Sequence, residues 1–203
     1  MKTRFPNLLR NLSTLVLSTL VIFLSSCSSS SDIPLTTNYY LLNTLHYGEK
    51  SLNINKRVLV EVLELPDYLD QPQLVMQFNK HQLHYSRFDM WAEPLQVGFT
   101  KALINDLNLN KKSIQFVTDE RKFNDNIVYK LMVRIDYFHP NSASKVILSG
   151  VFWVDNNNDE RYKVQQPFSF ELLLNDDGYT HAIEKMRQLV TMMSASVLQD
   201  NYK

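Results

Sequence analysis

The stretch Ile127–Phe138, with the sequence Ile-Val-Tyr-Lys-Leu-Met-Val-Arg-Ile-Asp-Tyr-Phe, decides the fold of this chain. Every second residue from Tyr129 to Tyr137 is apolar or aromatic, and three of the residues between them are charged. Because successive side chains of a β-strand point to opposite faces, this alternation predicts a long strand with one buried face. Tyr137 is expected on the buried face, whereas Phe138 is expected to point outward, as is Trp153 in the next segment.

Two more strands are predicted at 146–154 and 162–174, with a polar turn at 155–160 between them. Consecutive strands joined by polar turns indicate an antiparallel meander. The inward face of the second strand is expected to comprise Tyr162, Val164, Phe168, Phe170, Leu172 and Leu174. A helix is predicted to begin near Asn175–Asp177, because acidic groups favour the positive end of a helix dipole. Its apolar side comprises Ala182, Ile183, Met186, Leu189, Val190, Met193 and Val197.

The first half of the chain predicts shorter elements. Strands are expected at 39–42 and 57–65, and a hairpin is expected at 74–78 and 82–85. Two prolines and two aspartates exclude regular structure from 66–72, which is predicted to be a structured loop. The apolar face of the second strand comprises Val58, Val60 and Val62.

The segment Phe88–Leu95 is expected to start the first helix, with Pro94 at the opening position, where its missing N–H costs nothing. The buried face of this helix comprises Leu95, Phe99, Ala102, Leu103 and Leu107. These elements together predict a single two-layer α+β domain at 38–203. Its sheet is expected to be mixed but largely antiparallel, with two main helices packed on one face.

The N-terminus has the build of a secretory signal. Lys2, Arg4 and Arg10 precede a run of thirteen residues, Leu12–Leu24, in which serine and threonine alone interrupt the apolar residues. This run is shorter than the roughly 20 residues that a membrane-spanning helix needs. Residues 1–26 are therefore predicted to be a cleaved signal peptide, after which Cys27, the only cysteine, begins the mature chain.

The sequence Leu24-Ser25-Ser26-Cys27 resembles a bacterial lipobox, which implies that Cys27 is acylated with palmitate-like chains. The other reading is an ordinary signal followed by a free thiol, but a lone cysteine in an oxidising compartment has no disulfide partner. Ser28 stands where an aspartate would resemble an inner-membrane retention signal. The resemblance therefore implies an anchor in the outer membrane, facing the periplasm, with residues 27–37 as the lipidated N-terminus and linker.

Composition excludes several classes of function. After residues 1–26 are removed, 18 basic and 21 acidic residues remain, and no basic run exceeds Lys111-Lys112. Such a chain is not expected to bind nucleic acid, which draws on clustered Lys and Arg. The four glycines are too far apart for a phosphate-binding loop, and neither a nucleophile elbow nor a catalytic triad can be proposed. We expect no catalytic activity and no cofactor.

One turn matches a calcium-binding loop in part. Asp155, Asn157 and Asp159 occupy its first alternate ligand positions. However, Glu160 stands where the loop needs glycine, and Gln166 stands where the bidentate glutamate belongs. The pattern favours a solvated hairpin turn, and no metal site is predicted.

Three segments occur in the order Tyr39–Leu42, Leu65–Val75 and Trp91–Leu95. The second reads Leu-Pro-Asp-Tyr-Leu-Asp-Gln-Pro-Gln-Leu-Val, and the third reads Trp-Ala-Glu-Pro-Leu. Together with the lipobox, they resemble the PqiC (YmbA) family of ABC-transport auxiliary lipoproteins. The order and length of the family fit essentially the whole mature chain, but no motif after Leu107 matches residue by residue.

The resemblance implies a non-catalytic docking component of an intermembrane lipid transport system that supports envelope integrity. Its partners would be an envelope-bridging protein with MCE domains, an inner-membrane protein and further copies of itself in a ring. A second reading is that the domain carries a lipid or other apolar ligand itself. The candidate interface or motif residues are Pro66, Tyr68, Leu69, Pro72, Trp91, Glu93 and Pro94. For the tyrosine, the leucine and the Trp-Ala-Glu-Pro segment, a role in folding and a role at an interface both remain open.

Overall fold

The protein was analysed as a computed structural model, in which a compact unit spans Thr36–Lys203. The described residues are 36–43, 54, 56–110, 113–118, 127–155 and 164–201. The predicted signal peptide, the predicted acylation site Cys27, the turn residues 156–160 and Tyr162 lie outside them. None of the helices in the described part of the chain is long and apolar enough to cross a membrane.

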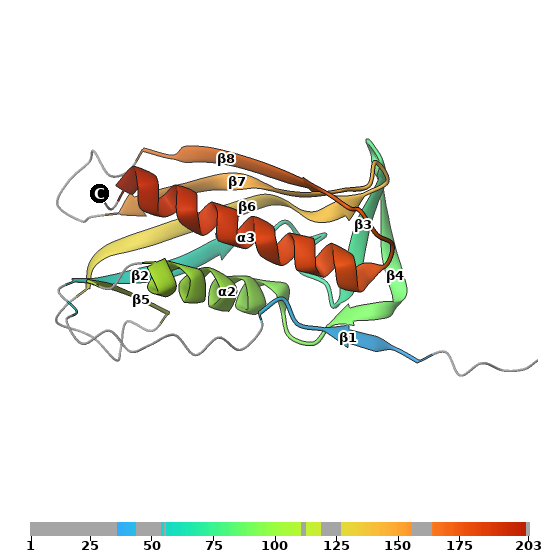
Figure 1. Cartoon of the computed structure of the whole chain (residues 1–203), viewed down its shortest axis with the longest axis horizontal. Coiled ribbons are helices and arrows are strands. Elements are labelled where there is room, and N and C mark those ends of the chain that lie inside the picture. The colour runs from blue at the N-terminus through green and yellow to red at the C-terminus, as the bar shows by residue number, and fades with distance from the viewer. Residues whose placement is uncertain are drawn as a thin grey trace, which may run out of the picture. The chain divides into compact units, whose positions relative to one another are not determined.

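The described strands form one eight-stranded sheet (Figure 1). They are β1 (Asn38–Tyr40), β2 (Lys56–Glu64), β3 (Gln73–Asn79), β4 (Gln82–Trp91), β5 (Ile114–Val117), β6 (Ile127–Asn141), β7 (Lys145–Asp155) and β8 (Gln166–Leu173). The predicted meander is confirmed, because β6, β7 and β8 pair antiparallel in sequence order. On its other edge, β6 pairs parallel with β2 and, at its end, with β3. β5 and β1 pair parallel with β2 and β4, so the sheet is mixed.

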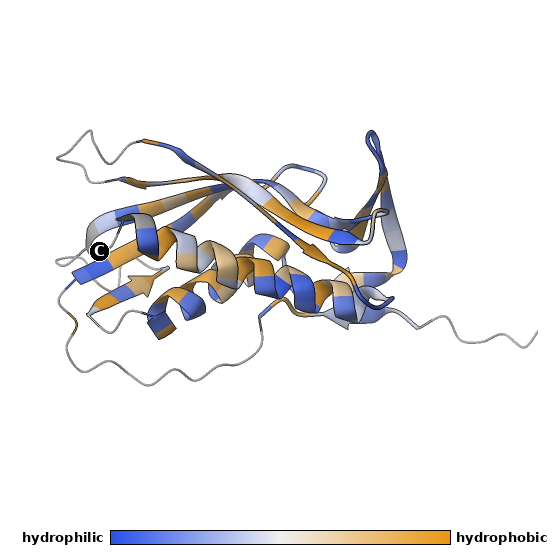
Figure 2. Cartoon of the chain, turned by 45° about the horizontal axis from the view of Figure 1, so that its top comes forward, coloured by the Kyte–Doolittle hydropathy of each residue, from blue (hydrophilic) through white to orange (hydrophobic). Residues whose placement is uncertain are grey.

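Two described helices, α2 (Leu95–Asn110) and α3 (Tyr179–Asn201), cover the same face of the sheet (Figure 1). Both predicted apolar stripes face inward, and Figure 2 shows them as orange segments that alternate with blue ones along each helix. The sheet meets the helices through close contacts such as the edge-on pair of Phe99 and Phe138, whose ring centroids are 5.4 Å apart. The predicted two-layer α+β architecture is therefore confirmed.

A β-bulge in β6 corrects the predicted orientation of two aromatic residues. The register against β7 shifts between Ile135 and Tyr137. Because one extra residue reverses the alternation of the faces, Tyr137 is 49% exposed and Phe138 is fully buried, the opposite of the expectation. Trp153, on regular β7, is half-buried.

Two further boundaries differ from the prediction. β4 continues to Trp91, so the segment Phe88–Trp91 is the end of a strand, and α2 begins only at Leu95. The proline that precedes the helix was a sound marker of its start, but the alternating strand before it was not recognised. Val164 lies before β8 and is 65% exposed, whereas it was expected to face inward.

Candidate functional site

The first feature of the site is an interruption in the sheet beside β6. β2 pairs with β6 as far as Arg134, and β3 meets β6 only at Asn141. In this interval, the Tyr68 hydroxyl donates a hydrogen bond to the Asp136 carbonyl at 2.9 Å. Because a half-buried carbonyl needs a partner, Tyr68 takes the place of a strand at this point. Burial raises the pKa of the Tyr68 hydroxyl far above its usual range, so the group stays a donor.

The loop that carries Tyr68 is shaped by its own backbone. The N–H groups of Leu69 and Asp70 donate to the Pro66 carbonyl, at 2.8 and 3.3 Å. This turn directs the Leu69 side chain into the core, where it is 2% exposed. Pro66 is half-buried and Pro72 is exposed, so the two prolines frame the loop without occupying a hydrogen-bonding strand position.

Backbone hydrogen bonds join the end of β4 to this loop, and the residue after β4 to β1. The Trp91 N–H donates to the Pro72 carbonyl at 2.7 Å, and the Ala92 N–H donates to the Tyr40 carbonyl at 2.8 Å. The three segments that carried the family resemblance therefore meet in one place. We call this assembly of Tyr40, the loop 66–72 and the segment 91–95 the motif junction.

A carboxylate holds β1 in the motif junction. Asp89 accepts hydrogen bonds from Asn38 and from the Tyr40 hydroxyl, both at 3.0 Å, and from the Ser86 hydroxyl at 2.7 Å. Burial raises the pKa of Asp89, but these three hydrogen bonds outweigh it and hold the pKa below its usual value. The ionised carboxylate therefore ties β1 to β4.

The last motif residues start α2. The Pro94 carbonyl accepts hydrogen bonds from the N–H groups of Val97 and Gly98, at 2.9 and 3.1 Å. Glu93, which precedes α2, pairs with Lys101 about two turns along, with Oε2 and Nζ 2.5 Å apart. Because the lysine side chain is half exposed, this ion pair contributes little stability.

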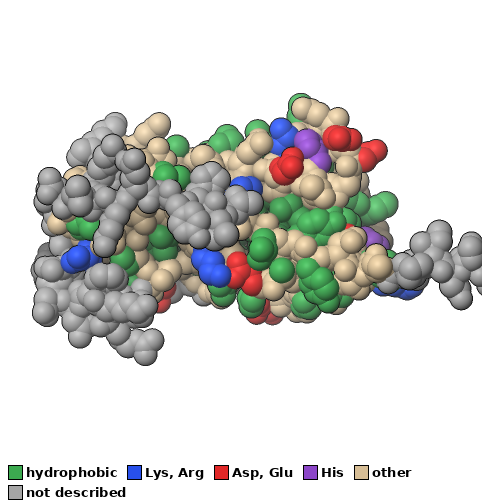
Figure 3. Space-filling model, turned by 60° about the horizontal axis from the view of Figure 1, so that its bottom comes forward, with side chains coloured by type: hydrophobic (Ala, Val, Ile, Leu, Met, Phe, Trp, Pro, Cys, Tyr) green, Lys and Arg blue, Asp and Glu red, His purple; other side chains and the backbone are tan. Residues whose placement is uncertain are grey.

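The predicted interface residues divide by exposure. Leu69 and Trp91 lie in the core, Pro66, Tyr68 and Glu93 are half-buried, and Pro72 and Pro94 are exposed. Next to them, Tyr39 and Leu41 on and after β1 are 66% and 54% exposed, and Val97 on α2 is 42% exposed. Figure 3, which turns α2 and β1 toward the reader, has hydrophobic side chains gathered on this part of the surface. The interface role of the motif residues stays a prediction.

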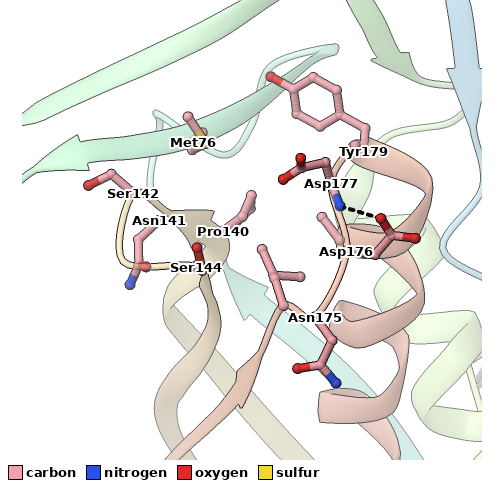
Figure 4. Close-up of a pocket in the computed structure, with 12 residues that line it drawn as sticks. Met76, Pro140, Asn141, Ser142, Ser144, Asn175, Asp176, Asp177 and Tyr179 are labelled. Atoms are coloured by element: carbon pink, nitrogen blue, oxygen red, sulfur yellow. Dashed lines mark hydrogen bonds between the residues drawn. The ribbon is translucent and has the colours of Figure 1, made fainter.

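A groove of about 520 Å³ opens at the same end of the sheet. One wall is Met76 of β3 with the turn after β6, which includes Ser142 and Ser144, and the other wall is the connection from β8 to α3. Figure 4 shows Pro140 between the two walls and the Asp177 carboxylate directed into the groove. Sequence analysis did not find this site, because its walls come from segments far apart in the chain.

The walls of the groove are held by hydrogen bonds. Ser142 donates its N–H to the Gln77 carbonyl at 2.9 Å and its hydroxyl to the Phe78 carbonyl, which fixes the turn against β3. The Leu174 N–H donates to the Ser144 carbonyl at 2.8 Å, which fixes the two walls to each other. The groove is therefore a preformed feature of the fold.

The motif junction supports the floor of this groove. A packing gap of about 10 Å³ beneath it is lined by the motif residues Leu69 and Trp91 and by three residues that also line the groove, Pro140, Tyr179 and Ala182. The space is too small for a ligand and holds no more than about one water. The buried motif residues thus position the groove from below.

No three His, Cys, Asp or Glu side chains among the described residues are placed to hold a metal ion. A largely buried ion pair joins the two helices, where Arg187 donates two hydrogen bonds of 2.5 and 2.6 Å to Asp106, and Thr191 donates a third at 2.9 Å. This network joins α2 to α3, although the buried Arg187 Nε has no hydrogen-bond partner in the described part of the chain. Sequence reasoning missed it because the partners lie on different helices.

Comparison with known proteins supports these observations at the level of the family. The family model for the ABC-type transport auxiliary lipoprotein component matches residues 40–197. The intermembrane transport lipoprotein PqiC of Escherichia coli K12 is 26% identical over 181 residues, which cover 88% of this chain and 92% of that protein.

Two solved structures share the fold. An uncharacterised protein superposes with a TM-score of 0.70 at 22% identity and covers 81% of this chain and 98% of its own. A protein from Xanthomonas campestris superposes with a TM-score of 0.63 at 13% identity and covers 79% and 92% of the two chains.

Proposed function

Because this chain belongs to the family of ABC-type transport auxiliary lipoproteins, we propose that it is a non-catalytic docking component of an MCE-type intermembrane lipid transport system. In this proposal, acylated Cys27 anchors it to the outer membrane, and residues 38–203 form one periplasmic domain. The partners are an MCE-domain protein that bridges the envelope, with its inner-membrane protein, and further copies of the chain in a ring.

The observation that carries the docking role is the filled interface between sheet and helices. Phe99, Leu103 and Leu107 of α2 and Leu189 and Met193 of α3 are fully buried there. A carrier would need an apolar cavity of several hundred Å³ between these layers to enclose an acyl chain. The large hollow described above is instead an open groove at the end of the sheet, with polar residues in its walls. This arrangement favours a protein that binds a partner at its surface over one that encloses a lipid.

The position of β1 supports the tether. β1 is the first described strand, and Asp89 and Ala92 hold it at the edge of the sheet. A linker that ends at residue 37 therefore enters the fold at a fixed point beside the motif junction and the groove. Such a tether keeps this end of the unit connected to the membrane that holds the acyl chains.

Native mass spectrometry of the acylated chain, released from membranes in mild detergent, tests the proposal. A discrete oligomer that retains no lipid beyond the acyl chains and recruits the MCE-domain protein is the expected result. A monomer that retains one exchangeable lipid per chain would contradict docking and favour the alternative function, a periplasmic lipid carrier. A chain in which a cleavable secretory signal without a lipobox replaces residues 1–27 serves as the control for anchoring. It should leave the membrane fraction while it keeps its assembly.

A further inference from the structure

We propose that the groove between the β6–β7 turn and the start of α3 receives a basic segment of the bridging partner. The segment would be an extended stretch with a Lys or Arg side chain beside apolar residues. This inference rests on the docking function proposed above and assigns it a place on the surface and a partner chemistry. The motif junction described earlier would then act beneath the groove, as its support.

Charge is the first argument. Asp176 and Asp177 are exposed on the groove wall, and neither has an ion-pair partner among the described residues. No Lys or Arg lines the groove, and the nearby Lys145 is paired with Glu171 at 2.8 Å. The positive end of the α3 dipole lies next to these carboxylates, but no Lys or Arg side chain of the described part of the chain neutralises them. The groove is therefore expected to attract a cationic side chain and to repel a lipid phosphate.

The directions of the two carboxylates indicate that Asp177, rather than Asp176, contacts the cationic side chain of the partner. The Asp176 carboxylate accepts the Asp177 N–H at 2.8 Å and is thereby turned along the chain. The Asp177 carboxylate has no hydrogen-bond donor among the described residues and points into the groove (Figure 4). Asp177 is thus the acceptor for the cation, and Asp176 fixes its backbone.

The walls fit a peptide flanked by apolar side chains. Met76, Pro140, Leu174 and Tyr179 supply apolar surface to the groove, and Ser142 adds a hydroxyl. A volume of about 520 Å³ lies within the range of sites that hold small ligands, so it accommodates a few residues of chain. Because the groove is already held by hydrogen bonds, binding requires little ordering of this protein.

Site-specific crosslinking in the full-length chain tests the inference. A photoreactive residue at Ser142, which is exposed on the groove, should form an adduct with the MCE-domain partner, and peptide mapping should place that adduct next to a Lys or Arg. The same group at Leu109, which is 48% exposed near the end of α2, is the positional control and should give a weaker adduct or none.

Neutralising the groove tests the charge. The double variant Asp176→Asn and Asp177→Asn keeps the oxygen that accepts the Asp177 N–H, so it should fold normally. Loss of a charge-assisted contact should weaken partner binding, measured with purified proteins, by about tenfold or more. The double variant Glu61→Gln and Glu64→Gln, on exposed positions of β2, removes the same charge elsewhere and should bind as the unmodified chain does.

The outcomes separate this inference from the docking function. The groove is not the partner site if the partner forms an adduct at Leu109 but not at Ser142, or if the Asp176→Asn and Asp177→Asn double variant binds the partner as tightly as the unmodified chain. Either result leaves the docking function intact. An adduct at Ser142 that contains a phospholipid or a second copy of this chain overturns the basic segment as occupant. If the MCE-domain protein binds nowhere on the acylated chain, the proposed function itself fails.

Discussion

The motif junction and the β6–β8 meander reach stability in different ways. The meander repeats one contact type, and many apolar residues would satisfy its alternating pattern. The junction uses single contacts between defined atoms, such as Tyr68 with the Asp136 carbonyl and Trp91 with the Pro72 carbonyl. The difference explains why the first half of this sequence carries residue-specific segments and the second half carries only a pattern.

The largest effect is expected between the two helices, of which α2 follows the motif junction and α3 follows the meander. Asp106→Ala leaves the Arg187 side chain, which is 19% exposed, without its carboxylate. Removal of one partner of a buried ion pair costs about 3–5 kcal/mol, and the partial exposure of Arg187 places the expected loss at the lower end of this range. Chemical denaturation should show this loss of unfolding free energy. If the cost is charge burial, the double variant Asp106→Leu and Arg187→Met should recover most of it. A double variant as unstable as the single one would indicate instead that helix packing depends on this pair.

The next test looks for a residue-specific position inside the meander. Gly150 lies opposite the bulge in β6, and a Cβ there would be 2.1 Å from the Arg134 carbonyl oxygen. Because backbone must move to admit it, Gly150→Ala should cost about 3 kcal/mol in unfolding free energy. The adjacent Ser149→Ala should change stability by less than about 0.5 kcal/mol, since Ser149 faces the other side. Equal losses of stability at both positions would contradict a specific requirement for glycine opposite the bulge.

A smaller effect is expected when a single hydroxyl group, that of Tyr68, is removed from the motif junction. Tyr68→Phe removes the donor to the Asp136 carbonyl and should lower the unfolding free energy by about 1.5 kcal/mol. Tyr137→Phe is the matched control, because its hydroxyl has no hydrogen bond among the described residues and its side chain is 49% exposed. The comparison of regions would weaken if the two substitutions cost the same in thermal and chemical denaturation.

The smallest effect depends on pH and concerns His139, which lies on β6 of the meander and contacts Tyr68 of the motif junction. Burial lowers the pKa of His139, whose ring contacts those of Tyr68 and Tyr137, against the opposing hydrogen bond to the Pro140 carbonyl. Below about pH 6.5 the unfolded chain therefore binds a proton that the folded chain excludes. Stability should be full above this pH and fall as the pH decreases toward the folded pKa, with a slope of at most about 1.4 kcal/mol per pH unit. A His139→Gln variant should lose this slope, whereas His84→Gln, at an exposed position, should retain it.

The sequence predicted what depends on periodicity. Both helix stripes and the β6–β8 meander follow from spacings of three to four or two residues, which any local reading detects. The predicted outward orientation of Phe138 was wrong, because one bulge residue reverses the alternation of the faces. No residue type near Ile135 indicates a bulge.

The groove and the Asp106–Arg187 network could not be predicted for another reason. Their members lie on segments that meet only after the sheet has formed, so their proximity is a property of topology. The motif segments were found because their residue choice is unusual within each segment. That they meet each other, through Pro72 and Trp91, is information that the fold adds.

The short strand β1 also determines how this protein would respond to mechanical force. Tension along a tether that ends at residue 37 would enter the sheet at Asn38, which pairs with Asp89 of β4 and also donates its side-chain amide to that carboxylate. The hydrogen bond from the Ala92 N–H to the Tyr40 carbonyl would share this load, so the force is distributed over β4 and the residue that follows it. Under tension, β1 would detach before the rest of the sheet. Its detachment would lengthen the tether, while the motif junction would lose only its outermost strand.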